Sequence, residues 1–264
     1  MKKALALLVA LCATMFAAPA GAQDDVTIML AHGIPDTTVD VVVDGSVVIP
    51  NYEFGQMEDL SAFAGQTLAG LTVNLAGTDT VAIDVGDFAV PASGNFTVVA
   101  HLDAEGTPTV TVFENDTSTI AAGEGRLVVR HTAAAPEVDI WANDVAAFTN
   151  VPNGAEGQAD LPAGTISAQV VPAGVTEPVV IGPAQLPITE GASLIVYAVG
   201  SLEGDSLTVL TQSITGLGST PSVVNTGNTP IDNGSDSTSI VLLGAAALLG
   251  LGVVASRRGA LVRG

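Results

Sequence analysis

Short runs rich in valine, isoleucine and threonine recur along most of the chain, separated by glycine, proline, asparagine and aspartate. Such runs are typical of β-strands bounded by turns. Within one run, Val39, Val41 and Val43 share one parity, whereas Asp40 and Asp44 share the other. Because successive side chains of a strand point to opposite faces, we expect the valines in a core and the aspartates on a partly wet face. Val138 and Ile140, which match Val39 and Val41 in a later run, are expected in a core as well.

No helical period persists in these segments, so they are predicted to be strands throughout. The expected strands are 26–31, 39–44, 71–75, 81–85, 96–102 and 110–113, followed by 127–131, 138–141, 166–171, 178–181, 194–199 and 207–211.

The pattern occurs twice. Residues 32–41 match residues 131–140 at an offset of about 99, and later Ala-Gly and Glu-Gly pairs repeat with little drift. The chain is therefore predicted to hold two tandem immunoglobulin-like antiparallel β-sandwich domains, 24–122 and 123–216, without the cysteine pair of antibody domains. Because almost no linker separates the copies, we expect them to pack end to end.

The pattern His-x-x-x-Pro-x-x-Val-Asp-Val and the Ala-Gly turns resemble a family known as domain of unknown function 4397. Residues 128–140 and 161–165 match it best, whereas the first copy departs in having Ile34 before Pro35. The resemblance covers roughly residues 26–213 and implies an exported bacterial β-domain. It implies no activity, because the family has none assigned.

Both ends of the chain have the composition of targeting segments. Residues 1–22 carry two lysines, an apolar run and a small-x-small site, which predicts a signal peptide cleaved after Ala22. The only cysteine, Cys12, lies in this segment, so the mature protein is expected to have no thiol for a disulfide, a nucleophile or a metal.

At the C-terminus, residues 217–239 read as a flexible Ser/Thr/Asn/Gly/Pro stalk, 240–256 as a transmembrane helix and 257–264 as a basic cytoplasmic tail. This arrangement leaves the acidic part outside a single-pass membrane protein. Thr226 and Gly227, followed by a spacer, an apolar run and arginines, also resemble a sortase sorting signal, although Val223 and Val224 replace its Leu-Pro. A plain anchor and a cell-wall linkage by a sortase both stay open.

Charge excludes several partners. The formal net charge is −20, and between residues 23 and 239 only Arg126 and Arg130 are basic against all 27 acidic residues. Phosphate backbones and anionic bilayer surfaces would be repelled, so we expect no nucleic-acid partner. The excess of acids suits solubility and a loose association with cations.

Catalytic motifs are missing from the sequence. It contains no nucleophile elbow, zinc-protease helix motif, P-loop or dinucleotide glycine pattern, and we expect no cofactor. His32, His101 and His131 are the candidate bases, and the repetition of His32 at His131 favours a structural role for both. We therefore expect a protein that is not an enzyme.

Two kinds of ligand site have candidate residues. Asp116, Glu124 and Asp205 are expected in loops and could supply calcium ligands between the repeats. Trp141 and Tyr197 are the candidates for stacking on a sugar, although a lone tryptophan is more often a core residue.

One leading function and two alternatives remain. The first is a non-catalytic surface module, such as a stalk, an adhesin or an envelope-coat component, with a protein or polysaccharide partner. The alternatives are a secreted hydrolase acting on an envelope polymer and a calcium-stabilised surface protein. An enzyme should show a deep pocket that gathers histidines or acids, whereas a binding module should show a flat surface or a strand edge.

Overall fold

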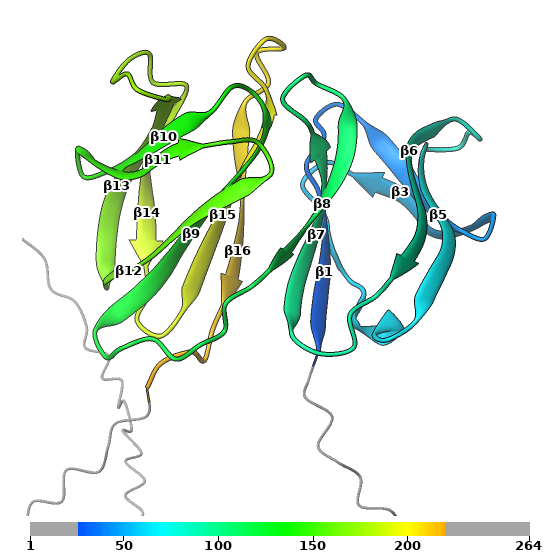
Figure 1. Ribbon diagram of the computed structural model, residues 1–264, viewed down its shortest axis with the longest axis horizontal. Coiled ribbons are helices and arrows are strands. Elements are labelled where there is room, and N and C mark those ends of the chain that lie inside the picture. Colours follow the sequence, from blue (N-terminus) through cyan, green and yellow to red (C-terminus); the bar gives the residue numbers. More distant parts are fainter. Residues whose placement is uncertain (1–25, 220–264) are drawn as a thin grey trace, which may run out of the picture. The chain divides into compact units, whose positions relative to one another are not determined.

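The computed structural model describes residues 26–219, and the regular secondary structure of this part of the chain consists of β-strands and one short 3₁₀ turn (Figure 1). The first eight strands are β1 (Thr27–His32), β2 (Thr38–Val43), β3 (Ser46–Glu53), β4 (Met57–Asp59), β5 (Thr67–Leu75), β6 (Val81–Ala89), β7 (Asn95–Leu102) and β8 (Pro108–Glu114). The 3₁₀ turn, η1 (Ser61–Phe63), lies between β4 and β5.

The second eight strands follow the same succession without a 3₁₀ turn. They are β9 (Glu124–Ala134), β10 (Val138–Ala142), β11 (Val145–Val151), β12 (Ala155–Pro162), β13 (Gly164–Pro172), β14 (Ile181–Ile188), β15 (Ser193–Ser201) and β16 (Thr208–Ile214).

The strands form four sheets of four. In the N-terminal sandwich, formed by β1–β8, the sheet orders are β4-β1-β7-β8 and β3-β2-β5-β6. In the C-terminal sandwich, formed by β9–β16, the orders β12-β9-β15-β16 and β11-β10-β13-β14 repeat this topology strand for strand. The all-β, sandwich-like prediction is thus confirmed, and His32 at the end of β1 has the topological place of His131 in β9.

Purely antiparallel sheets were expected from the sequence, and this expectation is wrong: one sheet of each sandwich contains a parallel pair. β1 pairs with β7 in parallel from Thr27↔Asn95 onward, and β9 pairs with β15 in parallel from Arg126↔Ser193. A parallel pair needs a long connection between its strands. That connection is supplied in each sandwich by the five strands between the two partners.

Each sandwich has its own apolar core. Val39 and Val41 are 2% and 6% exposed, and Val138 and Ile140 are 5% and 2% exposed, so the predicted core residues are confirmed. The first pair belongs to the core of the N-terminal sandwich and the second pair to the core of the C-terminal one. Alternation with a period of two therefore identified the inward faces of β2 and β10 correctly.

A third apolar cluster joins the two sandwiches. Ala31 and Val99 of the N-terminal sandwich pack with Val128, Ile195 and Val199 of the C-terminal one, and all five are nearly or completely buried. Strand β7 contacts both β9 and β15, so the sandwiches meet through the outer faces of two sheets. The expected end-to-end packing is therefore wrong, because these strands are apolar on both faces.

Several strands were missed or misplaced from the sequence. β3, β4, β11 and β12 were not expected, and the strand expected at 178–181 is β14, which begins at Ile181. β12 (Ala-Glu-Gly-Gln-Ala-Asp-Leu-Pro) has low intrinsic strand preference. It nevertheless pairs with β9 from Ala155↔His131 to Pro162↔Glu124, because β9 supplies a complete ladder beside it.

The predictions for the two chain ends fall largely outside the described residues. These comprise the signal peptide with Ala22, the sorting residues Thr226 and Gly227, the transmembrane helix and the basic tail. Residues 26–219 contain no helix with the length and hydropathy that a membrane crossing requires. The first three residues of the expected stalk are described, and they are hydrogen-bonded to the folded part. The Ile120 amide donates to the Leu217 carbonyl, and the Ser219 amide donates to the Ile120 carbonyl.

Candidate functional site

Arg130 of β9 lies at the centre of a buried polar network between the sandwiches. Its Nη2 donates to Asn115 Oδ1 at 2.7 Å, and its Nη1 donates to the Tyr197 hydroxyl at 2.9 Å. Its Nε donates to Glu156 Oε2 at 2.7 Å, directly across the β9–β12 ladder. Because the side chain is only 1% exposed, these partners must replace water around the charge. They leave none of its three nitrogens unpaired.

The network continues into both sandwiches. Asn115 Nδ2 donates to Asn95 Oδ1 at 2.7 Å and to Thr97 Oγ1 at 3.1 Å. Thr97 Oγ1 and the Tyr197 hydroxyl in turn both donate to Gln212 Oε1, at 3.0 and 2.5 Å. Strands β7, β15 and β16 are thereby joined by side chains that come from widely separated parts of the sequence.

This position removes Tyr197 from the list of sugar-binding candidates. The residue is 0% exposed, so neither face of its ring is available for stacking. Trp141 of β10 is half-buried, and its indole nitrogen is buried without a hydrogen-bond partner among the described residues. The two aromatic rings lie on strands of different sheets and do not form a common platform.

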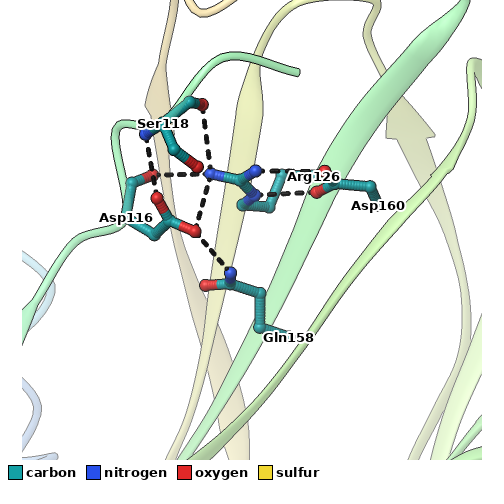
Figure 2. A network of polar contacts seen from close by, with 5 residues as sticks. All are labelled: Asp116, Ser118, Arg126, Gln158 and Asp160. Carbon is teal, nitrogen blue, oxygen red and sulfur yellow. Dashed lines mark hydrogen bonds and ion pairs between the residues drawn. The ribbon is translucent and has the colours of Figure 1, made fainter. Parts of the chain in front are cut away.

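Arg126, also on β9, anchors the connection between the sandwiches (Figure 2). Its Nε and Nη2 form a bidentate pair with Asp160, at 2.7 and 3.0 Å. Its Nη1 lies 3.0 Å from Asp116 Oδ2 and also donates to the backbone oxygens of Asp116 and Ser118. Gln158 Nε2 donates to Asp116 Oδ2 at 2.8 Å. One guanidinium thus ties the β8–β9 connection to the edge strand β12.

These contacts engage the carboxylate of Asp116, one of the three candidate calcium ligands. Hydrogen bonds from Ser118, and to a lesser extent the neighbouring Gln158 and Arg126, lower the pKa of Asp116 to about 2. Its carboxylate is therefore ionised but already occupied. Glu124 begins β9, and Asp205 lies in the β15–β16 turn. The described residues contain no group of three or more carboxylates, histidines or cysteines placed to hold a metal ion, so these three candidates are not brought together.

The repeated histidines hold loops in place. Nε2 of His32 donates to the Thr37 carbonyl at 3.0 Å, and its Nδ1 accepts from the Ile34 amide at 3.3 Å. Nε2 of His131 donates to the Pro136 carbonyl at 2.9 Å. In both sandwiches the ring thus closes the turn that follows the first strand, across the proline that the sequence analysis singled out.

His101 of β7 is equally enclosed. Its Nδ1 donates to the Leu102 carbonyl at 2.9 Å, and its Nε2 accepts from Thr111 Oγ1 at 2.8 Å. Burial lowers the pKa of His101, as it does for the other two histidines. All three imidazoles are therefore neutral, buried and engaged with the protein, which is a poor arrangement for a general base.

Asp40 is buried, in contrast to the partly wet face expected for it. It is 8% exposed, and its two carboxylate oxygens accept hydrogen bonds from the amides of Asn51 at 2.7 Å and Gly77 at 2.9 Å. These bonds lower the pKa of Asp40. The donors lie at a bulge in β3 and at the β5–β6 turn, both at positive φ, so one carboxylate fixes two special backbone conformations.

Asp139 repeats this arrangement in the C-terminal sandwich. Its oxygens accept from the amides of Asn150 at 2.8 Å and Gly174 at 2.9 Å, and it is 6% exposed. The repetition of an entire hydrogen-bonding unit, donors included, indicates that these aspartates serve the fold. Neither is available to act on a ligand.

Two cavities of the described part gather no histidine and no acidic side chain. The N-terminal sandwich encloses a cavity of about 50 Å³ lined by apolar side chains, among them Leu30, Val41, Phe63 and Phe88. An open depression of about 570 Å³ in the C-terminal sandwich is lined by residues such as Ala142, with no ionisable side chain. Catalytic pockets generally combine apolar walls with a few convergent ionisable groups, and neither of these two cavities contains a histidine or a carboxylate.

Comparison with known proteins finds a family match for one segment of the chain and no activity. Residues 26–141 match the model of the Domain of unknown function (DUF4397) family. The matched segment begins just before β1 and ends within β10. No curated protein matches the chain. The family resemblance seen in the sequence is thus confirmed for this segment, and its description assigns no reaction or ligand.

The network around Arg130 was not predicted from the sequence. One signal was present: Arg126 and Arg130 are the only basic residues between 23 and 239, and four residues apart they share one face of a strand. Their cross-strand partners, Asp160 and Glu156, also lie four residues apart. The pairing became recognisable only once β12 was placed beside β9.

Proposed function

We propose that this chain is a non-catalytic module exported to the cell surface, where it binds a protein or polysaccharide of the envelope. The observation that carries the proposal is the burial of its basic side chains. Arg126, Arg130 and the three histidines are all less than 5% exposed and hydrogen-bonded within the protein. The described surface therefore offers neither a histidine base nor a cationic group to polarise a substrate.

The same burial explains what the surface can do. Acidic side chains are its only charged groups within the described residues, which favours solubility and cationic partners. Strand edges and turns provide the remaining contact area. Such a surface suits adhesion or coating better than chemistry on a bound polymer.

A retention assay separates the binding module from the hydrolase. The purified chain is incubated with envelope polymers, and both the bound fraction and the soluble products are measured. We expect retention on at least one polymer or envelope protein and no released fragments. Released fragments from any of these polymers would overturn the proposal in favour of a hydrolase.

Export is tested independently of the ligand. The mature protein is expected to begin at Gln23 and to be accessible to protease added to intact cells, because residues 1–22 have the pattern of a signal peptide. Mass analysis of the N-terminus and protease shaving provide the readouts. An N-terminus at Met1 would contradict export.

A further inference from the structure

Strand β16 is the free edge of its sheet. It is last in the order β12-β9-β15-β16, so one side of its backbone faces no strand of the described part of the chain. It pairs with β15 without a register shift from Ser193↔Ile214 to Val199↔Thr208. Its sequence, Thr-Val-Leu-Thr-Gln-Ser-Ile, contains no charge, proline or glycine. The unpaired row of backbone amides and carbonyls along this edge is therefore regular, and no charge, proline or bulge opposes pairing with another strand.

The other seven edge strands of the described sheets all carry features that oppose strand pairing. β4, β6 and β12 contain acidic residues, and β3, β8 and β14 contain proline. The ladder of β11 is interrupted by register shifts. Such charges, prolines and bulges are the usual means by which proteins block pairing at sheet edges. Their absence from β16 alone singles out this strand.

β16 is also held rigid while its edge stays open. Leu210 and Ile214 pack into the cluster between the sandwiches, and Gln212 belongs to the buried network. Thr211 and Ser213, which alternate with them, are exposed. A strand fixed on one face pays little ordering entropy when it acquires a neighbour, so it is preorganised for pairing.

We propose that β16 accepts an extended segment of a partner protein by strand addition, and that this segment carries lysine or arginine beside its pairing residues. The charge of the chain selects such a partner. No basic side chain is exposed in the described residues, and Glu203 and Asp205 are exposed in the turn that leads into β16. A second copy of the chain would instead bring two bodies of formal charge −20 together.

This inference deepens the proposed function, because it names the kind of partner that a non-catalytic module would hold. The two can fail separately. Released polymer fragments would remove the proposed function, whereas the peptide experiment below tests only the edge of β16.

The test uses the full-length chain in a neutral detergent and a labelled synthetic peptide of alternating threonine and valine with a lysine pair at each end. Fluorescence anisotropy measures binding, and hydrogen–deuterium exchange locates it. We expect binding that weakens as salt rises, with new amide protection at residues 208–214. A peptide with central proline, and one with glutamate pairs in place of lysine, should bind at least about tenfold more weakly.

Matched variants separate strand addition from general attraction of charges. Thr211→Lys places a cation on β16, and Val112→Lys places the same charge at the equivalent position of β8, where Val112 pairs with Val98 as Thr211 pairs with Val196. We expect about a tenfold or greater loss of affinity for Thr211→Lys and less than about a twofold loss for Val112→Lys. Ser213→Lys repeats the test at a second exposed position.

Three outcomes would overturn the proposal. Equal losses in the two lysine variants would mean non-specific attraction. Dimerisation that increases with salt and is abolished by Thr211→Lys would mean that a second copy occupies the edge. Protection of residues 208–214 in the absence of peptide, lost on deletion of residues 220–264, would mean that the chain covers β16 itself.

Discussion

The guanidinium carbon of Arg130 lies 4.3 Å from the centre of the Phe113 ring, although the two residues belong to different sandwiches. The same guanidinium lies 5.3 Å from the centre of the Tyr197 ring. A cation between two aromatic rings, with every nitrogen bonded, is strongly held in a desolvated site. This one side chain therefore contacts aromatic residues of both sandwiches where they meet.

Replacing Arg130 with methionine is expected to lower the free energy of unfolding by about 3 kcal/mol. The substitution keeps much of the apolar volume but leaves Asn115 Oδ1 and the Tyr197 hydroxyl without their buried donor. Urea unfolding measures the change. Glu156→Gln serves as the control, because Glu156 is 32% exposed and its loss of charge should cost less than about 1 kcal/mol. Equal effects of the two variants would refute a central role for Arg130.

Asp40→Asn and Asp139→Asn are each expected to destabilise the protein by about 1–3 kcal/mol. An amide retains one acceptor oxygen but presents an NH₂ group to the second backbone donor, which leaves that amide unsatisfied. Thermal and urea unfolding provide the measurement. Asp44→Asn, at an exposed turn residue, is the matched control and should change stability by less than about 0.5 kcal/mol. A neutral result for both buried aspartates would contradict their structural role.

Stability is expected to fall as the pH drops below about 7, because burial depresses the pKa of His32, His101 and His131 below the usual 6.5. The unfolded chain then binds protons that the folded chain refuses, so the stabilisation is complete above 6.5 and is lost as the pH falls toward the folded values. Urea unfolding between about pH 8 and pH 5 measures the slope.

A His101→Gln variant checks the origin of this slope, since it removes one titrating group and should flatten the pH dependence. The stabilisation linked to Asp116, whose pKa is lowered to about 2, lies in a separate window: it is complete above about pH 4 and is lost only as the pH falls toward 2. A pH profile that is flat between 8 and 5 would show that the histidines are not linked to folding.

Deletion of residues 240–264 is expected to release the protein into the medium, because the apolar run and the arginines after it form the predicted anchor. Cell fractionation and immunoblotting measure the release. Thr226→Ala distinguishes the two kinds of anchor. If this variant loses a linkage to the wall, the sorting signal is correct, and if it remains full-length in the membrane fraction, the plain helix is correct.

The sequence by itself determined the strand-rich class and the core faces of β2 and β10. Val39, Val41, Val138 and Ile140 were identified as core residues because alternation is a local property that any strand with one buried face must obey. The same local reading misjudged Asp40, since parity places a side chain on a face but does not reveal which backbone donors approach that face.

Only the tertiary structure decided how the sandwiches are joined and which polar groups are occupied. The partners of Arg130 lie 15, 26 and 67 residues away along the chain, on segments that only the fold brings beside it. β12 is a strand because β9 lies beside it, and Tyr197 is buried because a second sandwich covers β15. Hydrogen bonding and desolvation act between neighbours in space, so these features could not be derived from a pattern that records only neighbours in sequence.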